Sequence, residues 1–173
     1  NPKVNWSDYY TAINLANTLM YYNKEVYGKD QTFTKEMLDA VDAEALFIRS
    51  LAYFYLVRLW KDVPLVIEPS ISDTGNIYIE KSKETVVTQR IIDDLLIAKD
   101  MAYTTEFQGK PEFFGRANKF AIMALLADVY LWREEYDKCI EYCNAVMGSG
   151  LYGLENNETF FNNYFPGNSE VES

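Results

Sequence analysis

The sequence contains no histidine, and this absence excludes several classes of catalytic site. Without an imidazole there is no Ser-His-Asp or Cys-His arrangement, no HExxH zinc helix and no histidine proton shuttle near neutral pH. The chain also lacks a P-loop, a GxGxxG motif and a DxDxDG calcium loop. We therefore expect no catalytic residue, no metal and no cofactor, and a binding protein is favoured over an enzyme.

Basic residues are few: 16 Lys and Arg stand against 26 Asp and Glu, which makes the net charge −10. Nucleic acids and anionic lipid surfaces select for surplus Lys and Arg, so neither is expected as a partner. The longest stretch without a formal charge, residues 9–23, is too short and too polar to span a bilayer. Because the first residue is Asn and no signal peptide is visible, we expect a processed or excised segment.

Cysteine is equally scarce, since the chain has only two, Cys139 and Cys143. They lie four residues apart in a strongly helical stretch, where side chains stack along one face, so a disulfide would strain the helix. Both are predicted to be small buried side chains.

Apolar residues recur at three- and four-residue intervals along most of the chain, which predicts an all-α fold. Polar start signals and Gly or Pro stop signals bound each segment. The five predicted helices cover about residues 7–27, 34–61, 82–102, 116–133 and 136–147. In the second of them the predicted buried stripe consists of Val41, Ala45, Ile48, Ala52, Tyr55 and Leu59.

Three further local features are predicted. Ile77, Tyr78 and Ile79 form a short edge segment inside a polar loop, residues 69–82. Beyond Leu151 the chain is aromatic and Asn-rich without a period, which predicts an irregular C-terminal tail. A row of small residues in the fourth helix predicts close approach by a neighbouring helix, and its members are Ala117, Ala121, Ala124 and Ala127.

An internal repeat relates the second and fourth helices at an offset of 72 (132 minus 60). Leu59-Trp60 matches Leu131-Trp132, and Ala45 and Ala52 match Ala117 and Ala124. Each copy is followed by another helix. The second copy fits the tetratricopeptide spacing except that its final Phe-type position is Cys143 and its turn, residues 133–135, lacks glycine. The sequence therefore predicts one domain over residues 1–173, built of tetratricopeptide-like helical hairpins in an α-α superhelix, with repeat units at 43–102 and 115–148.

Two blocks in these helices resemble the SusD/RagB family. The first block contains Ala-Glu-Ala at residues 43–45, Arg49, a Tyr/Phe cluster at residues 53–55 and Asp-Val-Pro-Leu at residues 62–65. The second begins at Gly115-Arg116 and continues through residues 125–130 to Tyr136. The opening Trp6…Tyr9-Tyr10…Ile13…Ala16-Asn17 is similar to the family's preceding helix.

The resemblance implies a bacterial outer-membrane, surface-exposed lipoprotein that binds nutrients, with a lipid anchor that this sequence does not contain. It implies that the protein delivers an oligosaccharide to a TonB-dependent transporter partner. Family members are much longer, and their glycan contacts come largely from loops and a C-terminal region. This segment is therefore expected to serve mainly as scaffold and partner-docking surface, and no family binding residue maps onto a position here.

Candidate glycan-binding residues are Trp6, Asn76 and Tyr78, because aromatic faces stack on sugars and amides hydrogen-bond to them. The structural alternative is that Trp6 caps the first helix and Tyr78 pins its loop. For the remaining aromatic pairs and clusters, packing is the favoured interpretation: Tyr21-Tyr22, Tyr53-Phe54-Tyr55 and Phe160-Phe161.

Two other functions stay open. One is a generic helical-repeat scaffold for protein–protein interaction, which predicts an exposed polar concave face on the first helix of each pair. The other, more remote, is a glycoside-active enzyme using two carboxylates. The adjacent pairs Asp93-Asp94 and Glu134-Glu135 are interpreted instead as solvated faces and cap charges, and Asp128 as a buried structural ion pair.

Overall fold

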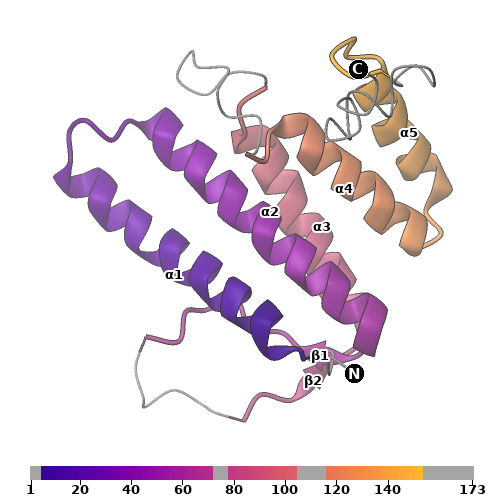
Figure 1. Cartoon of the computed structure of the whole chain (residues 1–173), viewed down its shortest axis with the longest axis horizontal. Helices are drawn as coiled ribbons and strands as arrows, with labels where there is room; N and C mark the ends of the chain where they lie inside the picture. The colour runs from indigo at the N-terminus through magenta and orange to yellow at the C-terminus, as the bar shows by residue number, and fades with distance from the viewer. Residues whose placement is uncertain (1–4, 72–77, 105–115, 154–173) are drawn as a thin grey trace, which may run out of the picture.

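The computed structural model describes residues 5–71, 78–104 and 116–153, which contain five helices and two very short strands. The helices are α1 (Ser7–Lys29), α2 (Lys35–Trp60), α3 (Glu84–Met101), α4 (Lys119–Trp132) and α5 (Tyr136–Met147). Each packs against the next in sequence, as a superhelical array does (Figure 1). The predicted all-α fold is confirmed, and the predicted tail beyond residue 153 lies outside the described residues.

Polar side chains define where the long helices begin. Thr34 caps α2, because its Oγ1 accepts the backbone N–H of Met37 at 3.2 Å. Asn118 caps α4 in the same way, with its Oδ1 2.9 Å from the backbone nitrogen of Ala121. At the other end, α2 stops at Lys61, whose φ of 61° breaks the helix before Pro64.

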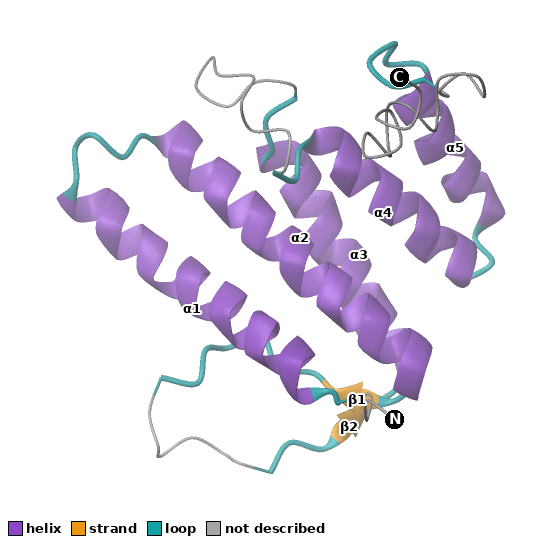
Figure 2. Cartoon of the chain, in the orientation of Figure 1, coloured by secondary structure: helices purple, strands orange, loops and turns teal. Residues whose placement is uncertain are grey.

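A long insertion separates α2 from α3 and is closed at its base by two strands (Figure 2). β1 (Val63–Pro64) pairs antiparallel with β2 (Lys81–Ser82), with Val63 opposite Ser82. Beside them, the Asp62 carboxylate accepts the backbone N–H of Glu84 at 2.9 Å. The predicted edge segment is wrong in its position along the chain, because Tyr78 and Ile79 precede β2 and belong to no strand. Ile77 lies outside the described residues.

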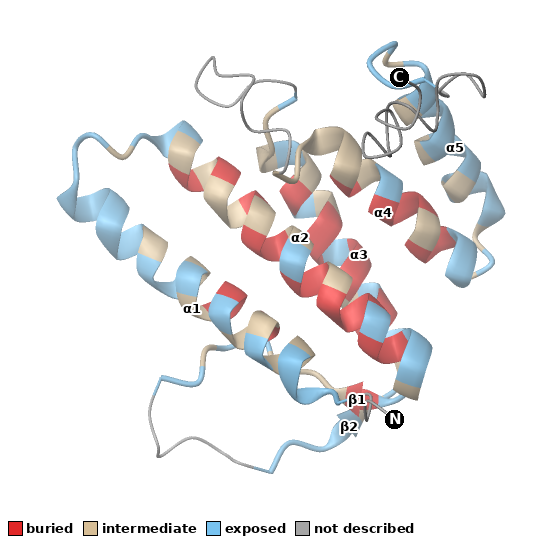
Figure 3. Cartoon of the chain, viewed as in Figure 1, coloured by how far each residue is buried: buried red, intermediate tan, exposed pale blue. Residues whose placement is uncertain are grey.

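The hydrophobic core is shared by α1 to α4, whereas α5 contributes no buried residue (Figure 3). The predicted stripe on α2 is wrong at three positions: Ile48, Tyr55 and Leu59 are each about half exposed. Because α2 is apolar on nearly every side, its periodicity allows more than one stripe, and its neighbours decide which is buried. Other residues of α2 are buried in the core, including Leu46, Ser50, Tyr53, Phe54, Leu56 and Val57.

The exposure of other apolar and small residues also depends on which elements pack against them. On α3, the apolar side chain of Val86 is 51% exposed. In the alanine row, Ala127 is buried, Ala117 and Ala121 are half-buried, and Ala124 is exposed. Cys139 is half-buried and Cys143 is exposed, because α5 is the last described helix and packs on one side only; both are free thiols.

The turn between α4 and α5 places Glu134 at φ 60°, a left-handed conformation that glycine adopts without steric cost. We expect Glu134→Gly to raise the free energy of unfolding by about 0.5–1 kcal/mol, because relief of strain exceeds the added chain entropy. Urea denaturation measures the difference. Glu134→Ala, which removes the charge but keeps the strain, is the control and is expected to give no gain; equal gains from both variants would contradict the strain explanation.

Candidate functional site

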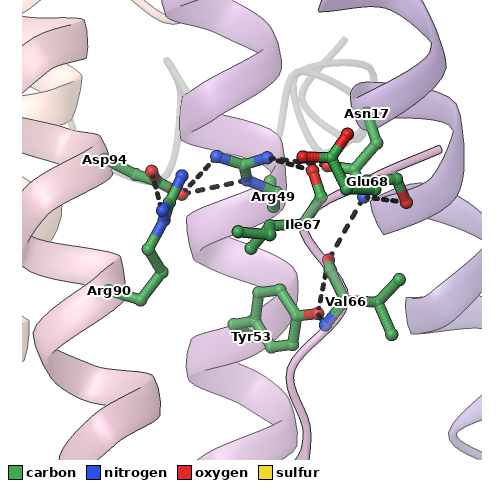
Figure 4. A network of polar contacts seen from close by, with 8 residues as sticks. All are labelled: Asn17, Arg49, Tyr53, Val66, Ile67, Glu68, Arg90 and Asp94. Carbon is green, nitrogen blue, oxygen red and sulfur yellow. Dashed lines mark hydrogen bonds and ion pairs between the residues drawn. The ribbon is translucent and has the colours of Figure 1, made fainter. Parts of the chain in front are cut away.

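A network of buried polar side chains lies at the centre of the molecule, around Arg49 of α2 (Figure 4). Its Nε and Nη2 lie 2.9 Å and 2.7 Å from Oδ2 of Asp94 on α3. Its Nη1 donates to Oδ1 of Asn17 on α1 at 2.7 Å, and Arg90 Nε donates to the second Asp94 oxygen at 2.8 Å. One guanidinium therefore joins three helices inside the core.

The same network holds the extended chain that follows β1. The Asn17 Nδ2 group donates to the carbonyls of Val66 and Glu68 at 3.2 and 3.3 Å. The Tyr53 hydroxyl donates to the Val66 carbonyl at 2.9 Å and accepts the Val66 N–H at 2.7 Å. These bonds satisfy backbone groups that a loop would otherwise bury unpaired, so the network fixes the path of the insertion.

The electrostatics of this network suit a structural role. Burial raises the pKa of the Asp94 carboxyl, and the charges and hydrogen bonds of Arg49 and Arg90 oppose part of that rise. Both carboxylate oxygens accept from guanidinium groups, and Asp94 is only 2% exposed, so a substrate in solvent cannot reach it for proton transfer. The expectation that Asp94 belongs to a solvated face is therefore wrong; burial by α2 and the pairing with Arg49 are tertiary effects.

Asp128, the other carboxylate singled out in the sequence, is paired but not buried. Its Oδ2 accepts from Arg58 Nη1 at 3.3 Å, and both side chains are more than 40% exposed. The Arg58 guanidinium also lies over the rings of Phe54 and Trp132, with distances to the ring centroids of 4.8 and 5.7 Å. The predicted ion pair is present, whereas its predicted burial is wrong, because the pair lies at the surface between α2 and α4.

An aromatic cluster gathers where α1 begins and α2 ends. Trp6 lies 6.2 Å from both Tyr10 and Trp60, measured between ring centroids. Tyr9 contacts Trp60 edge-on and stacks on Tyr55 at 6.0 Å. Trp6 and Tyr55 remain 41% and 49% exposed, so the cluster presents aromatic surface to solvent. Trp6 is also the N-cap residue of α1: its backbone carbonyl accepts the N–H of Tyr10 at 3.1 Å, whereas its side chain makes no capping hydrogen bond.

A hollow of about 470 Å³ adjoins this cluster and is lined on one side by polar groups. Asn14 Oδ1 accepts the N–H of Ser70 at 2.7 Å, which orients the amide and leaves its Nδ2 without a bond to a described residue. Aromatic surface beside hydroxyls and an amide is the combination that sugar rings require. The lining residues of this hollow, called here the Trp6 pocket, are Trp6, Ser7, Tyr10, Thr11, Asn14 and Leu15.

Of the other two candidate residues, Tyr78 does not line this pocket. Tyr78 is 89% exposed, so it does not pin its loop, and no ring contact or hydrogen bond within the described ranges links it to Trp6. Asn76 lies outside the described residues. Sequence reasoning missed Asn14 and Thr11, whose only signal was that they follow Trp6 and Ser7 by one or two helical turns.

A second hollow, of about 430 Å³, separates the exposed faces of α1 and α2. Its walls include Leu15, Leu19 and Ile48, which are 64%, 41% and 49% exposed. Arg116 and Glu44 close one end with a bidentate ion pair at 2.5 and 2.6 Å. The peptide-scaffold hypothesis predicted a polar face on α2, whereas the exposed line of α2 that borders this groove is apolar.

Residues 5–71, 78–104 and 116–153 contain neither a cluster of three or more metal-binding side chains nor a membrane-spanning helix. No group of three or more Cys, Asp and Glu side chains could hold a metal ion. In addition, none of the helices is sufficiently long and apolar to cross a membrane.

Comparisons with known proteins show similarity to SusD-like proteins. A family model described as SusD-like, "Starch-binding associating with outer membrane", matches residues 1–131. SusD-like protein P2 of Formosa agariphila is 32% identical over 164 residues, covering 94% of this chain. A SusD-like protein from Bacteroides fragilis superposes with a TM-score of 0.78 at 25% identity over 95% of this chain. A laminarin-binding SusD-like protein also gives 0.78, at 25% identity over 92% of this chain.

The chain spans only about a third of the length of these relatives. The match covers 30% of the Formosa protein, 31% of the Bacteroides fragilis chain and 35% of the laminarin-binding chain. The resemblance to SusD-like proteins identified in the sequence is confirmed, together with the helical fold.

Proposed function

Because the chain belongs to the SusD-like family, whose members are starch-binding and associate with the outer membrane, we propose that it binds carbohydrate without transforming it. The Trp6 pocket is the observation that carries this proposal. Its volume of about 470 Å³ lies within the range of small-molecule sites, and it combines aromatic surface with side-chain donors and acceptors. A sugar stacks its apolar face on Trp6 and hydrogen-bonds to Asn14 and Thr11.

The proposal includes that the chain binds a glycan without cleaving it. The glycosidase alternative needs two carboxyl groups that flank the substrate, one of them able to donate a proton. Asp94 is engaged by two arginines, and the Trp6 pocket has no acidic lining residue. Carbohydrate capture therefore rests on stacking and hydrogen bonding alone.

The finer proposal concerns the whole protein. As a surface-exposed lipoprotein anchored by a segment outside this chain, it hands an oligosaccharide to a TonB-dependent transporter. The apolar α1–α2 groove supports a scaffolding role, because exposed Leu15 and Ile48 are typical of surfaces that contact other protein. Tyr78, with its ring almost fully exposed, and Asn76 remain further proposed contacts for the glycan on the insertion loop.

We expect Trp6→Ala to weaken binding of a soluble glucan, starch oligosaccharide or laminarin, at least about tenfold, since a stacking side chain at the centre of a site contributes more than 1 kcal/mol. Titration calorimetry or affinity electrophoresis measures the change. Trp6→Tyr, which keeps an aromatic face, is expected to retain most of the affinity.

Tyr27→Ala is the matched control. Tyr27 lies on the same helix, at the opposite end, and is 43% exposed against 41% for Trp6. Its removal is expected to leave glucan affinity unchanged, and circular dichroism confirms that each variant is folded. Equal affinity of Trp6→Ala and the unaltered chain for every glucan that binds would exclude the Trp6 pocket as the site.

A further inference from the structure

The two cysteines of α5 form a pair of neighbouring free thiols at the surface of the molecule. Cys139 is half-buried and packs against the hydrophobic core, whereas Cys143 is exposed. Residues four apart in a helix lie about 40° from each other around its axis, so the two side chains share one face of α5. The thiols also interact directly, because a hydrogen bond from Cys143 is among the influences on the Cys139 thiol.

The spacing of this pair does not suit a disulfide but suits an ion that bridges the two sulfurs. Residues four apart in a helix have Cβ atoms about 5–6 Å from each other. A disulfide requires about 3.5–4.5 Å between the two Cβ atoms, so it would distort α5. With metal–sulfur bonds of about 2.3 Å, as for zinc, two thiolates on one ion lie up to about 4.6 Å apart. The undistorted helix therefore presents two sulfurs at a separation that an ion can bridge.

The surroundings of Cys139 favour a bound cation. Burial raises the pKa of the Cys139 thiol, and the contact with Cys143 and the negative charge of Asp128 on α4 raise it further. Negative charge beside a sulfur disfavours its thiolate but attracts a cation. An ion bound to both sulfurs therefore offsets the free energy needed to remove their protons.

The number of ligands selects the kind of ion. Zinc in structural sites takes four ligands and calcium six or more, and the motifs for these ions are absent from the sequence. Within the described part of the chain, no group of three or more Cys, Asp and Glu side chains could hold a metal. Thiolates select soft cations such as Cu(I), which accepts two thiolates in a linear arrangement.

We propose that Cys139 and Cys143 together form a two-thiolate site for a soft monovalent cation of the Cu(I) type. The ion forms one bond to each sulfur, and both thiol protons pass to water. No electron is transferred, so the step needs neither an oxidant nor a reductant. The site lies on α5, whereas the residues of the Trp6 pocket lie at the start of α1, so the proposal is independent of glycan binding.

Transfer of Cu(I) from the coloured chelator bicinchoninate to the chain, without oxygen, tests the proposal. One ion per chain is expected to transfer. Cys139→Ser and Cys143→Ser are each expected to lower the affinity at least tenfold, because a single thiolate remains. Circular dichroism confirms that each variant is folded.

The matched control combines Cys143→Ser with Asn144→Cys. It keeps two thiols and an exposed second position, but it moves that thiol to about 140° from Cys139 around the helix. The control is expected to bind Cu(I) as weakly as the single variants. Equal affinity of this control and the unaltered chain would overturn the proposal, because the spacing of the thiols would then be irrelevant.

Two further measurements define the ligands of the ion. X-ray absorption of the Cu(I)-loaded chain is expected to show two sulfur neighbours, and a single sulfur neighbour would contradict the site. The competing arrangement is an ion shared by Cys143 of two molecules. One ion per two chains, a larger size in gel filtration and no dependence on Cys139 would assign the ion to that arrangement and overturn the proposal.

Discussion

Arg49→Ala is expected to lower the free energy of unfolding by about 3–5 kcal/mol, a large part of the stability of a domain this size. The substitution leaves the Asp94 carboxylate buried with only Arg90, and it removes the guanidinium that also binds Asn17. An uncompensated buried charge costs far more than the loss of a contact in water. Urea denaturation followed by circular dichroism measures the change.

Arg58→Ala is the matched control, because Arg58 lies on the same helix and also pairs with an aspartate of another helix. Its partner Asp128 and its own side chain are each more than 40% exposed, so the expected ionic contribution is below about 1 kcal/mol. Losses of similar size for the two variants would contradict the assignment of Arg49 as the central buried contact. A double-mutant cycle between Arg49 and Asp94 would then isolate their coupling.

The second large effect is a loss of stability at alkaline pH. Burial raises the pKa of Tyr53 from 10.0 to about 12, and burial also raises the pKa of Tyr10 above its ordinary value. Both hydroxyls donate to backbone carbonyls of the insertion, Tyr53 to Val66 and Tyr10 to Pro64. Ionisation therefore removes two bonds that hold the extended chain against α1 and α2.

The direction of the effect follows from which state keeps the proton. The folded chain holds the Tyr53 proton above pH 10, whereas the unfolded chain releases it, so rising pH favours unfolding. The contribution of Tyr53 is fully present below pH 10 and is lost by about pH 12, and a rise of two pH units in its pKa corresponds to about 3 kcal/mol.

Free energies of unfolding at pH 8, 10, 11 and 12 test this prediction. Tyr53→Phe is expected to be less stable than the unaltered chain at pH 8, because Val66 loses its partner, and to lose less stability as the pH rises. Tyr27→Phe, which removes an exposed tyrosine, is expected to follow the unaltered chain at every pH. If the free energy of unfolding of Tyr53→Phe falls with pH as steeply as that of the unaltered chain, the alkaline loss of stability is caused by other groups than Tyr53.

Local sequence predicted the helices well, because their signals are contained in adjacent residues. The Thr34 cap, the break before Pro64 and the apolar periodicity of residues 84–101 each depend on neighbours within a few positions. The face buried by α2 was not predictable in this way. Ile48 and Leu46 are equally apolar and two positions apart, and only the packing of other elements around α2 decides that Leu46 is buried and Ile48 is exposed.

In the candidate site, too, one residue was identified from the sequence and the others only from the tertiary structure. Trp6 was identified from its residue type, whereas the pocket beside it depends on Asn14 and Thr11, and on Ser70 from the distant insertion, whose N–H orients the Asn14 amide. The importance of Arg49 was visible only as one residue of a family-like block. Its partners lie 32 and 45 positions away, too far for any local pattern to pair them.

The missing histidine, the acidic charge and the helical periodicity therefore determined by themselves that this is a helical chain without imidazole chemistry. The two blocks resembling SusD-like proteins determined its family. Tertiary structure alone decided which apolar faces are buried, that Asp94 is a core ion pair, and that Trp6 stands beside a polar hollow. The physical reason is that propensity, capping and charge are properties of nearby residues, while burial and pairing depend on which helices lie against one another.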